Sequence, residues 1–566
     1  MSSAGSDKSD RCAVCQVPAT LTCSACKSVK YCGKDHQREH WQEHKVECES
    51  SYRIENDAIL GRHLLVTRDI QAGNVIFEEK PLVVGPKWFV SEREQEVPVM
   101  PCVGCYTPCR IGGFSCTKCQ WPCCSPHCED IENPNSHGID CEILRLGPGP
   151  KTTSDIKAMT DYYRPDALLV LKCLLLQKQN PKKWKKLMKM QSHEEDREGS
   201  ELQEDAEKRV VTYLMKNFLE PLKKREETAK EKLLEQYDAK ILRRICGIIE
   251  TNYMVISLST GLDLSGVFFT ACMMEHSCMP NSYFQFNECD GCSISVIAGR
   301  DIKEGEHIKI MYTNMLWATQ MRLEHLQITK HFKCHCERCT DPTELGSYFS
   351  ALKCAGDVNT KCDGGIQLPK DPLDKKTDWI CNKCPMVVNG EQVGYLLTQM
   401  TEEVKTLMAR RPTVKQVESL IEKLGTFLHP NHYHMFSLKH CLIQLYGNEM
   451  GYKSEQMSSS QLQKKLKMCE DLYDICQKLD PATIRLSIYV AIIFHEMHTV
   501  YMEQGRRMLD DDKIQALELF TNAKESLEKA EEVLEKELDG VAGNKLNDHI
   551  LRAMKNVKFY MENMCS

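Results

Sequence analysis

Long apolar runs are missing from this 566-residue sequence, and its first ten residues, MSSAGSDKSD, hold no apolar segment. We therefore expect neither a membrane-spanning helix nor a secretory signal. An excess of basic residues is missing too, because 73 lysines and arginines face 80 acidic residues, for a net charge of −7. Since a duplex-binding protein needs a basic face, this balance argues against direct DNA binding.

Cysteine, in contrast, is abundant, with 32 cysteines and 19 histidines. A chain without a secretory route is expected in the reducing cytoplasm and/or nucleus, where clustered cysteines bind metal rather than form disulfides. Its length predicts several domains. We expect an intracellular, monomeric protein whose partners are other proteins rather than membranes.

The first cysteine cluster contains four pairs of ligands, each two to four residues apart. These pairs are Cys12 and Cys15, Cys23 and Cys26, Cys32 and His36, and His44 and Cys48. Such close pairs face one ion from a tight turn, and zinc takes four cysteine or histidine ligands tetrahedrally. The cluster therefore predicts two zinc ions, without which so small a segment would hardly fold.

Three further cysteine groups follow. The second cluster repeats the layout of the first with Cys102, Cys105, Cys116, Cys119, Cys124, Cys128, His137 and Cys141. The third group, in HFKCHCERC, has only three ligands, Cys334, Cys336 and Cys339, and so needs a fourth from elsewhere. The fourth group contains Cys354, Cys362, Cys381 and Cys384, whose looser spacing leaves open whether it holds a further zinc. About five ions are expected, or six with this group.

The remaining chain alternates between strand-like and helical patterns. Val, Ile and Phe alternate loosely over 58–86 and again over 251–317, with turns at glycine, which predicts short strands. Residues 155–250 and the region from about 392 onward have apolar residues at three- and four-residue spacing. We therefore expect helices there, with five to eight in an antiparallel array at the C-terminal end.

Specific motifs within these regions resemble a known family. YCGKDHQREHWQEHKVEC resembles the end of a MYND zinc finger, with Trp41 as its packing aromatic residue. GRHLLVTRDIQAGNVIFEE resembles the opening of a SET domain, EHSCMPN its NHSCxPN element, and GEHIKIMYTN its closing GEExxxxY element. CHCERC resembles the post-SET zinc region. In this combination and order, the chain resembles the SET and MYND domain-containing (SMYD) family, and its arthropod SmydA branch in particular.

The resemblance implies an α+β multidomain fold in which a MYND-like module interrupts the SET β-fold. The expected parts are a disordered 1–10, an N-terminal MYND finger at 11–49, the first SET part at 58–100, a second MYND-like module at 101–145, a helical SET-I-like insert at 146–250, the SET C-terminal core at 251–317, a post-SET and zinc-knuckle region at 318–390, and a C-terminal antiparallel helical (TPR-like) domain at 391–566. In the family, the first and third ligand pairs of a MYND finger share one zinc, and the second and fourth share the other. Cys278 of the HSC element joins Cys334, Cys336 and Cys339.

The family's activity is methylation of histone or other protein lysines with S-adenosyl-L-methionine. The resemblance makes Tyr312 the catalytic tyrosine. Cofactor contacts are expected from Gly61, Arg62, Asn252, Glu275, His276, Tyr312 and Phe332. MYND fingers of the family bind short, often proline-containing peptides.

Two positions depart from the family pattern. The opening GxG is replaced by Gly61-Arg62-His63, and the Asn of NHSC is replaced by Glu275, which removes a hydrogen-bond donor. A carboxylate at 275 could instead face the ammonium or sulfonium of the cofactor, so the change need not abolish binding. The alternative is a catalytically impaired zinc scaffold that binds protein partners, for instance in transcriptional repression. These two interpretations remain open at the level of sequence.

Overall fold

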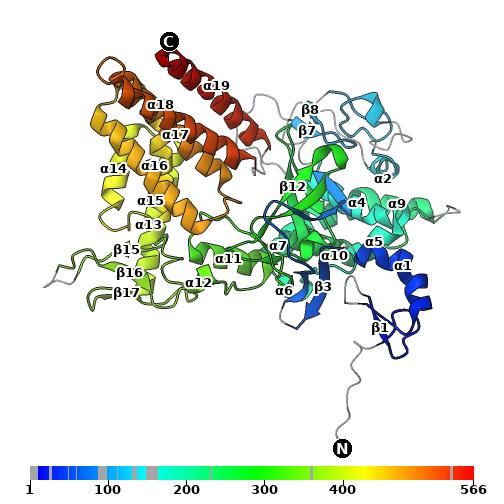
Figure 1. Ribbon diagram of the computed structural model, residues 1–566. Helices are drawn as coiled ribbons and strands as arrows, with labels where there is room; N and C mark the ends of the chain where they lie inside the picture. Colours follow the sequence, from blue (N-terminus) through cyan, green and yellow to red (C-terminus); the bar gives the residue numbers. More distant parts are fainter. Residues whose placement is uncertain are drawn as a thin grey trace, which may run out of the picture.

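The computed structural model describes residues 11–23, 29–48, 50–58, 60–86, 99–110, 113–129, 137–147, 163–227, 229, 232–356, 361–535 and 540–565. Figure 1 shows a strand-rich centre, with a bundle of long helices on one side and shorter helices and cysteine-rich loops on the other. This arrangement is the multidomain α+β architecture that the sequence predicts. No helix within these ranges combines the length and the apolar character needed to cross a lipid bilayer.

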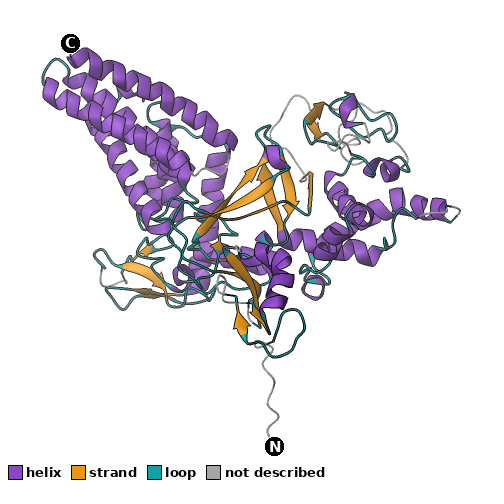
Figure 2. Cartoon of the chain, turned by 45° about the vertical axis from the view of Figure 1, so that its right-hand side comes forward, coloured by secondary structure: helices purple, strands orange, loops and turns teal. Residues whose placement is uncertain are grey.

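The strand-rich centre consists of small sheets (Figure 2). A hairpin joins β3 (Tyr52–Asp57) to β4 (Gly61–Val66), so the strands begin ahead of the predicted boundary at 58. Two three-stranded sheets have the orders β6-β10-β9 and β12-β13-β5. Their strands are β5 (Val75–Glu79), β6 (Val83–Pro86), β9 (Tyr253–Ser257), β10 (Asp263–Val267), β12 (Ser282–Asn287) and β13 (Ser293–Ala298). Each sheet thus pairs strands from before residue 100 with strands from after residue 250.

The helical insert packs directly onto this centre. α4 (Pro165–Gln179) starts with proline, which suits the first turn of a helix, and buries an almost continuous apolar run from Ala167 to Leu176. It lies so close to β6 that a Cβ at Gly85 would stand 2.8 Å from the Cβ of Leu169. α10 (Ala239–Asn252) is capped by the carboxylate of Asp238 and leads into β9.

Other short elements complete the insert and the cysteine-rich modules. The insert also contains α5 (Pro181–Leu187), α6 (Glu194–Arg197), α7 (Glu201–Ala206), α8 (Thr212–Leu214), α9 (Glu220–Glu226) and π-helical segments at Glu207–Val211 and Met215–Leu219. The N-terminal finger consists of β1 (Leu21–Thr22), β2 (Lys30–Tyr31) and α1 (Lys34–Cys48). The second module contains β7 (Val99–Pro101), β8 (Pro108–Arg110) and α2 (Asp140–Leu144). The knuckle region is a sheet of β15 (Leu352–Lys353), β16 (Ile366–Pro369), β17 (Trp379–Cys381) and β18 (Val387–Val388).

The C-terminal domain is the helical array that the periodicity predicts. Within its described residues it contains seven α-helices: α13 (Gly390–Ala409), α14 (Val414–Leu424), α15 (Tyr433–Leu445), α16 (Ser459–Leu479), α17 (Ser487–Met508), α18 (Lys513–Leu534) and α19 (Gly540–Cys565). Capping boxes at Thr413 and Ser458 define the starts of α14 and α16. The core of this domain extends to Cys278, Cys334 and Cys339, so the post-SET cysteines and the C-terminal helices share one hydrophobic core.

A buried ion pair lies inside that core. Lys465 of α16 is 1% exposed, and its Nζ lies 2.6 Å from Oε2 of Glu496 on α17, which is also buried. The same ammonium donates to the carbonyl of Tyr446 and to Oγ1 of Thr499. Burial opposes ionisation of Glu496, but the charge of Lys465 outweighs it and holds the pKa of Glu496 below its ordinary value.

We expect Lys465→Met to destabilise the protein by roughly 3–5 kcal/mol, because Glu496 then keeps a buried, unpaired charge. Lys464→Met is the matched control: Lys464 is exposed and pairs with Glu418 on the surface, so its loss is expected to cost about 1 kcal/mol or less. The measurement is urea unfolding followed by circular dichroism. Equal stabilities of the two variants would contradict this role of the pair.

Candidate functional site

The predicted tyrosine is positioned by a pair of short parallel strands. β11 (Glu275–His276) lies beside β14 (Lys309–Ile310), which brings the EHSC and HIKIMY segments together. The backbone N–H of Tyr312 donates to Nδ1 of His276 at 3.0 Å, and the Tyr312 hydroxyl donates to the carbonyl of Met274. Burial raises the pKa of Tyr312, so its hydroxyl stays protonated at neutral pH.

Aromatic rings surround the other side of this tyrosine. The ring of His276 lies 5.2 Å from that of Tyr312 and 5.9 Å from that of Phe332. Burial lowers the pKa of His276 to about 4, so the imidazole is neutral and its Nδ1 accepts the Tyr312 amide. His276 and Phe332 therefore form a packed support behind Tyr312.

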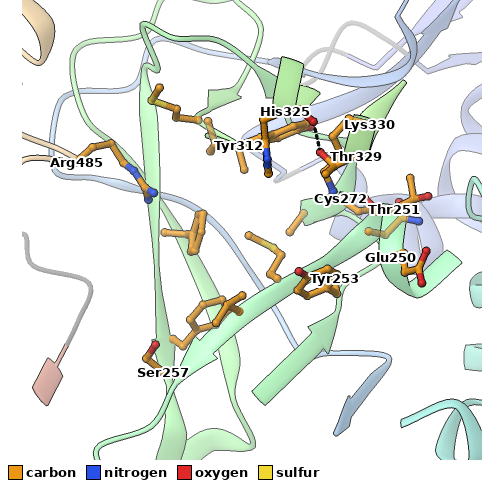
Figure 3. Close-up of a pocket in the computed structure, with 18 of the residues that line it drawn as sticks. Glu250, Thr251, Tyr253, Ser257, Cys272, Tyr312, His325, Thr329, Lys330 and Arg485 are labelled. Carbon is orange, nitrogen blue, oxygen red and sulfur yellow. Dashed lines mark hydrogen bonds between the residues drawn. The ribbon is translucent and has the colours of Figure 1, made fainter. Parts of the chain in front are cut away.

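A cavity of about 630 Å³ opens on the face of Tyr312 (Figure 3). Its walls come from the end of α10, from β9 and β12, from α11 (Thr319–Lys330) and from the start of α17. Its polar lining includes Arg197, Glu250, Thr251, Asn252, Tyr253, Tyr312, His325, Lys330 and Arg485. The buried Oγ1 of Thr251 has no hydrogen-bond partner among the described residues, so this wall holds a polar group that a ligand would satisfy.

Four of the predicted cofactor residues lie at or directly behind the cavity. Asn252 and Tyr312 line the cavity, while His276 and Phe332 pack behind it. Asn252 is held by its own amide, which donates to the carbonyls of Gln191 and Ile248.

Gly61 and Arg62 lie outside the cavity lining. Gly61 adopts φ +65°, a conformation that suits glycine. Arg62 donates to the carbonyl of Lys189 and lies over the ring of Phe269. The structure therefore brings some of the predicted contacts together in one cavity and leaves others apart.

The two departures from the family motifs meet in one cluster. The carboxylate of Glu275 bonds Nδ1 of His307, and the ring of His307 stacks on His63 with centroids 4.9 Å apart. His63 is 3% exposed, and its Nδ1 lies 3.7 Å from Asp57. The carboxylate of Glu275 is therefore bonded to a neighbouring imidazole and lies outside the cavity lining.

The cysteine groups are brought together as separate sets of four ligand atoms. Within each set, all ligand atoms lie within 4.8 Å of one another: Cys12, Cys15, Cys32 and His36; Cys102, Cys105, Cys124 and Cys128; Cys116, Cys119, His137 and Cys141; Cys278, Cys334, Cys336 and Cys339; Cys354, Cys362, Cys381 and Cys384. Sulfur–sulfur distances include 3.5 Å for Cys15–Cys32 and Cys278–Cys339, and 3.6 Å for Cys354–Cys384. A disulfide spans about 2.05 Å, whereas the edge of a tetrahedron with Zn–S bonds of about 2.3 Å spans about 3.8 Å. The donor sets therefore suit zinc.

The remaining set of the N-terminal finger is only partly described. Cys23 and His44 are both buried there, whereas Cys26 and the side chain of Cys48 lie outside the described residues. Trp41, expected as a packing residue, contacts the edge of His44 but is 40% exposed. Its position at the helix surface, rather than in the small core beside Tyr31, leaves the indole partly open to solvent.

Buried charges support the post-SET thiols. Arg322 donates from Nε to Sγ of Cys278 at 3.2 Å and pairs with Glu344 at 3.0 Å. Arg338 pairs with the same carboxylate, and all three charged side chains are essentially inaccessible to water. Four thiolates around a divalent ion carry a net negative charge, which these arginines offset.

The cavity residues that sequence reasoning missed include Cys272, Lys330 and Arg485. Lys330 stands two residues before Phe332, so proximity to that motif was a usable signal. Cys272 carries no motif, and Arg485 reaches the cavity only because the C-terminal domain docks beside the strands.

Comparisons with known proteins agree with this geometry. The MYND finger family model matches residues 12–48, and the SET domain model matches residues 61–313. The SET domain-containing protein SmydA-8, isoform A, of Drosophila melanogaster is 30% identical over 340 residues, which cover 60% of this chain and 65% of that protein. The Arabidopsis thaliana protein named histone-lysine N-methyltransferase ASHR1 is 25% identical over 67% of this chain and 73% of its own length.

Among solved structures, the SET domain of LSMT bound to lysine and AdoHcy is similar to this chain over 92% of each chain, at 10% identity. Its TM-score of 0.29 is too low to carry any argument. The two family models together match the finger and the split strand-rich centre, in the order that the motifs have along the chain. The chain therefore belongs to the SET and MYND domain-containing family, as a member similar to the SmydA proteins.

Proposed function

We propose that this protein is an S-adenosyl-L-methionine-dependent protein-lysine N-methyltransferase acting on histone or other protein lysines. The observation that carries the proposal is the cavity beside Tyr312, built on the paired EHSC and HIKIMY segments. When bound, S-adenosyl-L-methionine supplies an electrophilic methyl group. The volume of about 630 Å³ lies within the usual range for small-molecule sites, and the unsatisfied hydroxyl of Thr251 offers it a polar contact.

The residues of the chain meet the limited needs of this chemistry. The Tyr312 hydroxyl donates to Met274, which leaves its oxygen lone pairs to accept an N–H or a polarised C–H from a bound group. The apolar side chains of Met254, Phe284 and Ile310 line the same cavity and exclude water from an amine held there. Asn252 holds its orientation through two backbone carbonyls, so the wall is preorganised.

The departures at positions 63 and 275 support the enzyme over the scaffold alternative. Both side chains are engaged with His307 and lie outside the cavity lining. Since neither enters the cavity, these replacements give no reason to expect loss of the cofactor.

The cysteine groups are proposed to bind zinc, with about five ions or six, one for each set of four ligands. Distances between ligand atoms near a tetrahedral edge support this occupancy, also at the loosely spaced group of Cys354, Cys362, Cys381 and Cys384. Hydrogen bonds orient several ligands; for example, Nδ1 of His137 contacts the carbonyl of Cys128, which leaves Nε2 beside Cys119.

A second, binding function is proposed for the N-terminal finger. Lys34, Gln37, Arg38 and Trp41 line a surface groove of about 310 Å³. Their spacing of three and four residues puts them on one face of α1. An exposed indole flanked by two cations suits a short proline-containing peptide with acidic residues, because proline packs on aromatic faces and the cations attract carboxylates.

Tyr312→Phe is expected to reduce methyl transfer about a hundredfold or more while changing cofactor affinity only a few-fold, because it removes one oriented oxygen from the reacting centre. Tyr283→Phe is the control, since Tyr283 is a buried tyrosine of β12 outside the cavity lining. Isothermal titration with S-adenosyl-L-methionine measures binding, and labelled methyl transfer to core histones and a protein library measures activity. Absence of cofactor binding to the zinc-loaded wild type would reject the enzyme in favour of the scaffold.

Cys278→Ser is expected to lower the zinc content by about one ion, because a hydroxyl is a poor zinc ligand and Cys278 joins three other thiols. Cys441→Ser is the matched control, since Cys441 lies on α15 outside the sets of four. Inductively coupled plasma mass spectrometry counts the ions. An unchanged content in Cys278→Ser would refute the shared site between the HSC element and the post-SET region.

Trp41→Ala is expected to weaken binding of proline-containing acidic peptides about tenfold or more, because an exposed tryptophan in a groove is a typical binding hot spot. Gln42→Ala removes the exposed neighbour that lies off the groove and is expected to have little effect. Fluorescence anisotropy with a set of synthetic proline-rich peptides provides the measurement. Equal affinities of both variants would exclude the groove as the docking site.

A further inference from the structure

A lysine of the chain itself reaches into the cavity. Lys330 is the last residue of α11, and Figure 3 shows it with Thr329 and His325 near Tyr312. Its Nζ lies 5.7 Å from the centroid of the Tyr312 ring and donates to the carbonyl of Thr251 at 2.6 Å. The amine is therefore anchored over the ring of the tyrosine that defines the proposed reaction centre.

No carboxylate neutralises this lysine among the described residues. Glu250 lines the same cavity but pairs with Arg197. The ion pairs of the described residues include none made by Lys330, whose polar contact is a backbone carbonyl. Burial, and then the charge of Arg197, lower the pKa of Lys330 to about 8. About half of this amine is therefore unprotonated at pH 8, against about 1% or less for an ordinary lysine.

These features are what a methyl acceptor requires. The amine is desolvated and oriented, and a nitrogen that donates one N–H to a carbonyl retains its lone pair for another direction. The ring of Tyr312 lies under the same nitrogen at a distance typical of cation–π contacts, which also accommodates a methylated ammonium. A lysine that served only as a structural cation would be expected to face a carboxylate.

We propose that Lys330 is a modification site of this protein, methylated within the same chain by the cavity that it lines; this inference rests on the proposed methyltransferase function. The lone pair of Nζ forms a bond to the methyl carbon of S-adenosyl-L-methionine while the carbon–sulfur bond breaks. The electron pair of that bond stays on sulfur and yields the thioether S-adenosyl-L-homocysteine. The proton displaced from nitrogen leaves to water.

The first experiment incubates the zinc-loaded full chain with S-adenosyl-L-methionine that carries a deuterated methyl group, followed by peptide mass spectrometry. The label is expected on Lys330 and absent from Lys333, an exposed lysine three residues further along. Because the reaction is intramolecular, its rate per chain is expected to stay constant as the protein is diluted. Lys330→Arg is expected to abolish the label and Lys333→Arg to leave it unchanged. A rate that falls in proportion to dilution, or a label confined to other lysines, overturns the proposal.

A second experiment measures binding without turnover. A protonated Lys330 repels a sulfonium but not a neutral thioether, so the ratio of the dissociation constants of S-adenosyl-L-methionine and S-adenosyl-L-homocysteine is expected to fall about tenfold as pH rises through 8. Lys330→Met is expected to remove this dependence. Burial raises the pKa of Cys272 to about 12, raises that of Tyr312 and lowers that of His325, so none of these three groups changes its charge near pH 8. Arg197, Glu250 and Arg485 are the other charged groups of the lining.

The outcomes separate this inference from the function on which it rests. If both compounds bind and an external protein is methylated while Lys330 stays unmodified, the inference is wrong and the proposed function stands. If neither compound binds, the proposed function fails and the inference with it. A ratio of dissociation constants that is identical in wild type and Lys330→Met at every pH also counts against Lys330 as the acceptor.

Discussion

The geometry of four ligands around one ion is the constraint on which the rest of this structure depends. A tetrahedral ion draws its donors to within about 3.8 Å of one another, whatever their separation along the chain. Cys278 and Cys334 are 56 positions apart, yet they belong to one such set. Because both are ligands of the same set, the HSC segment is held against the turn that follows α11. That turn brings Phe332 to His276, and the end of α11 brings Lys330 to Tyr312. The cavity is therefore a consequence of the thiol cluster, which the buried Arg322, Arg338 and Glu344 stabilise in turn.

The departures from the family pattern are coupled rather than independent. His307 stands at the second glutamate of the closing GEExxxxY element, and Glu275 stands at the asparagine of NHSC. A carboxylate thus replaces the motif's amide at 275, an imidazole replaces its carboxylate at 307, and the two side chains bond each other. His63 then stacks on His307 in place of a glycine. Because three changes satisfy one another at one place, the loss of a motif residue here does not imply the loss of the function that the motif serves in relatives.

Residue spacing was sufficient to predict the features that depend on local geometry. The CxxC pairs, the strands on both sides of the insert and the helical array all follow from short-range patterns, and the structure contains each of them. Side-chain direction was not predictable in the same way. The carboxylate of Glu275 has a partner 32 positions away, which a motif comparison limited to position 275 ignores. Arg485 lines the cavity only through domain docking, and the exposure of Trp41 depends on the size of the small core beneath it.

The presence of a lysine in the cavity also bears on how an external substrate is admitted. A substrate lysine needs the place beside Tyr312 that Lys330 holds through the carbonyl of Thr251. The opposite wall comes from the turn at Ile484 and Arg485. The carboxylate of Asp480 fixes this turn, because it accepts hydrogen bonds from the backbone amides of Arg485 and Leu486. One wall of the cavity therefore carries the amine of Lys330, and the other carries the guanidinium of Arg485 on a fixed backbone. A protein substrate that displaces Lys330 must supply contacts that replace those of Lys330. An acidic residue near the target lysine would do so by pairing with the guanidinium of Arg485. With the proposed function, substrate selectivity would follow from the competition between an internal and an external amine for one oriented site.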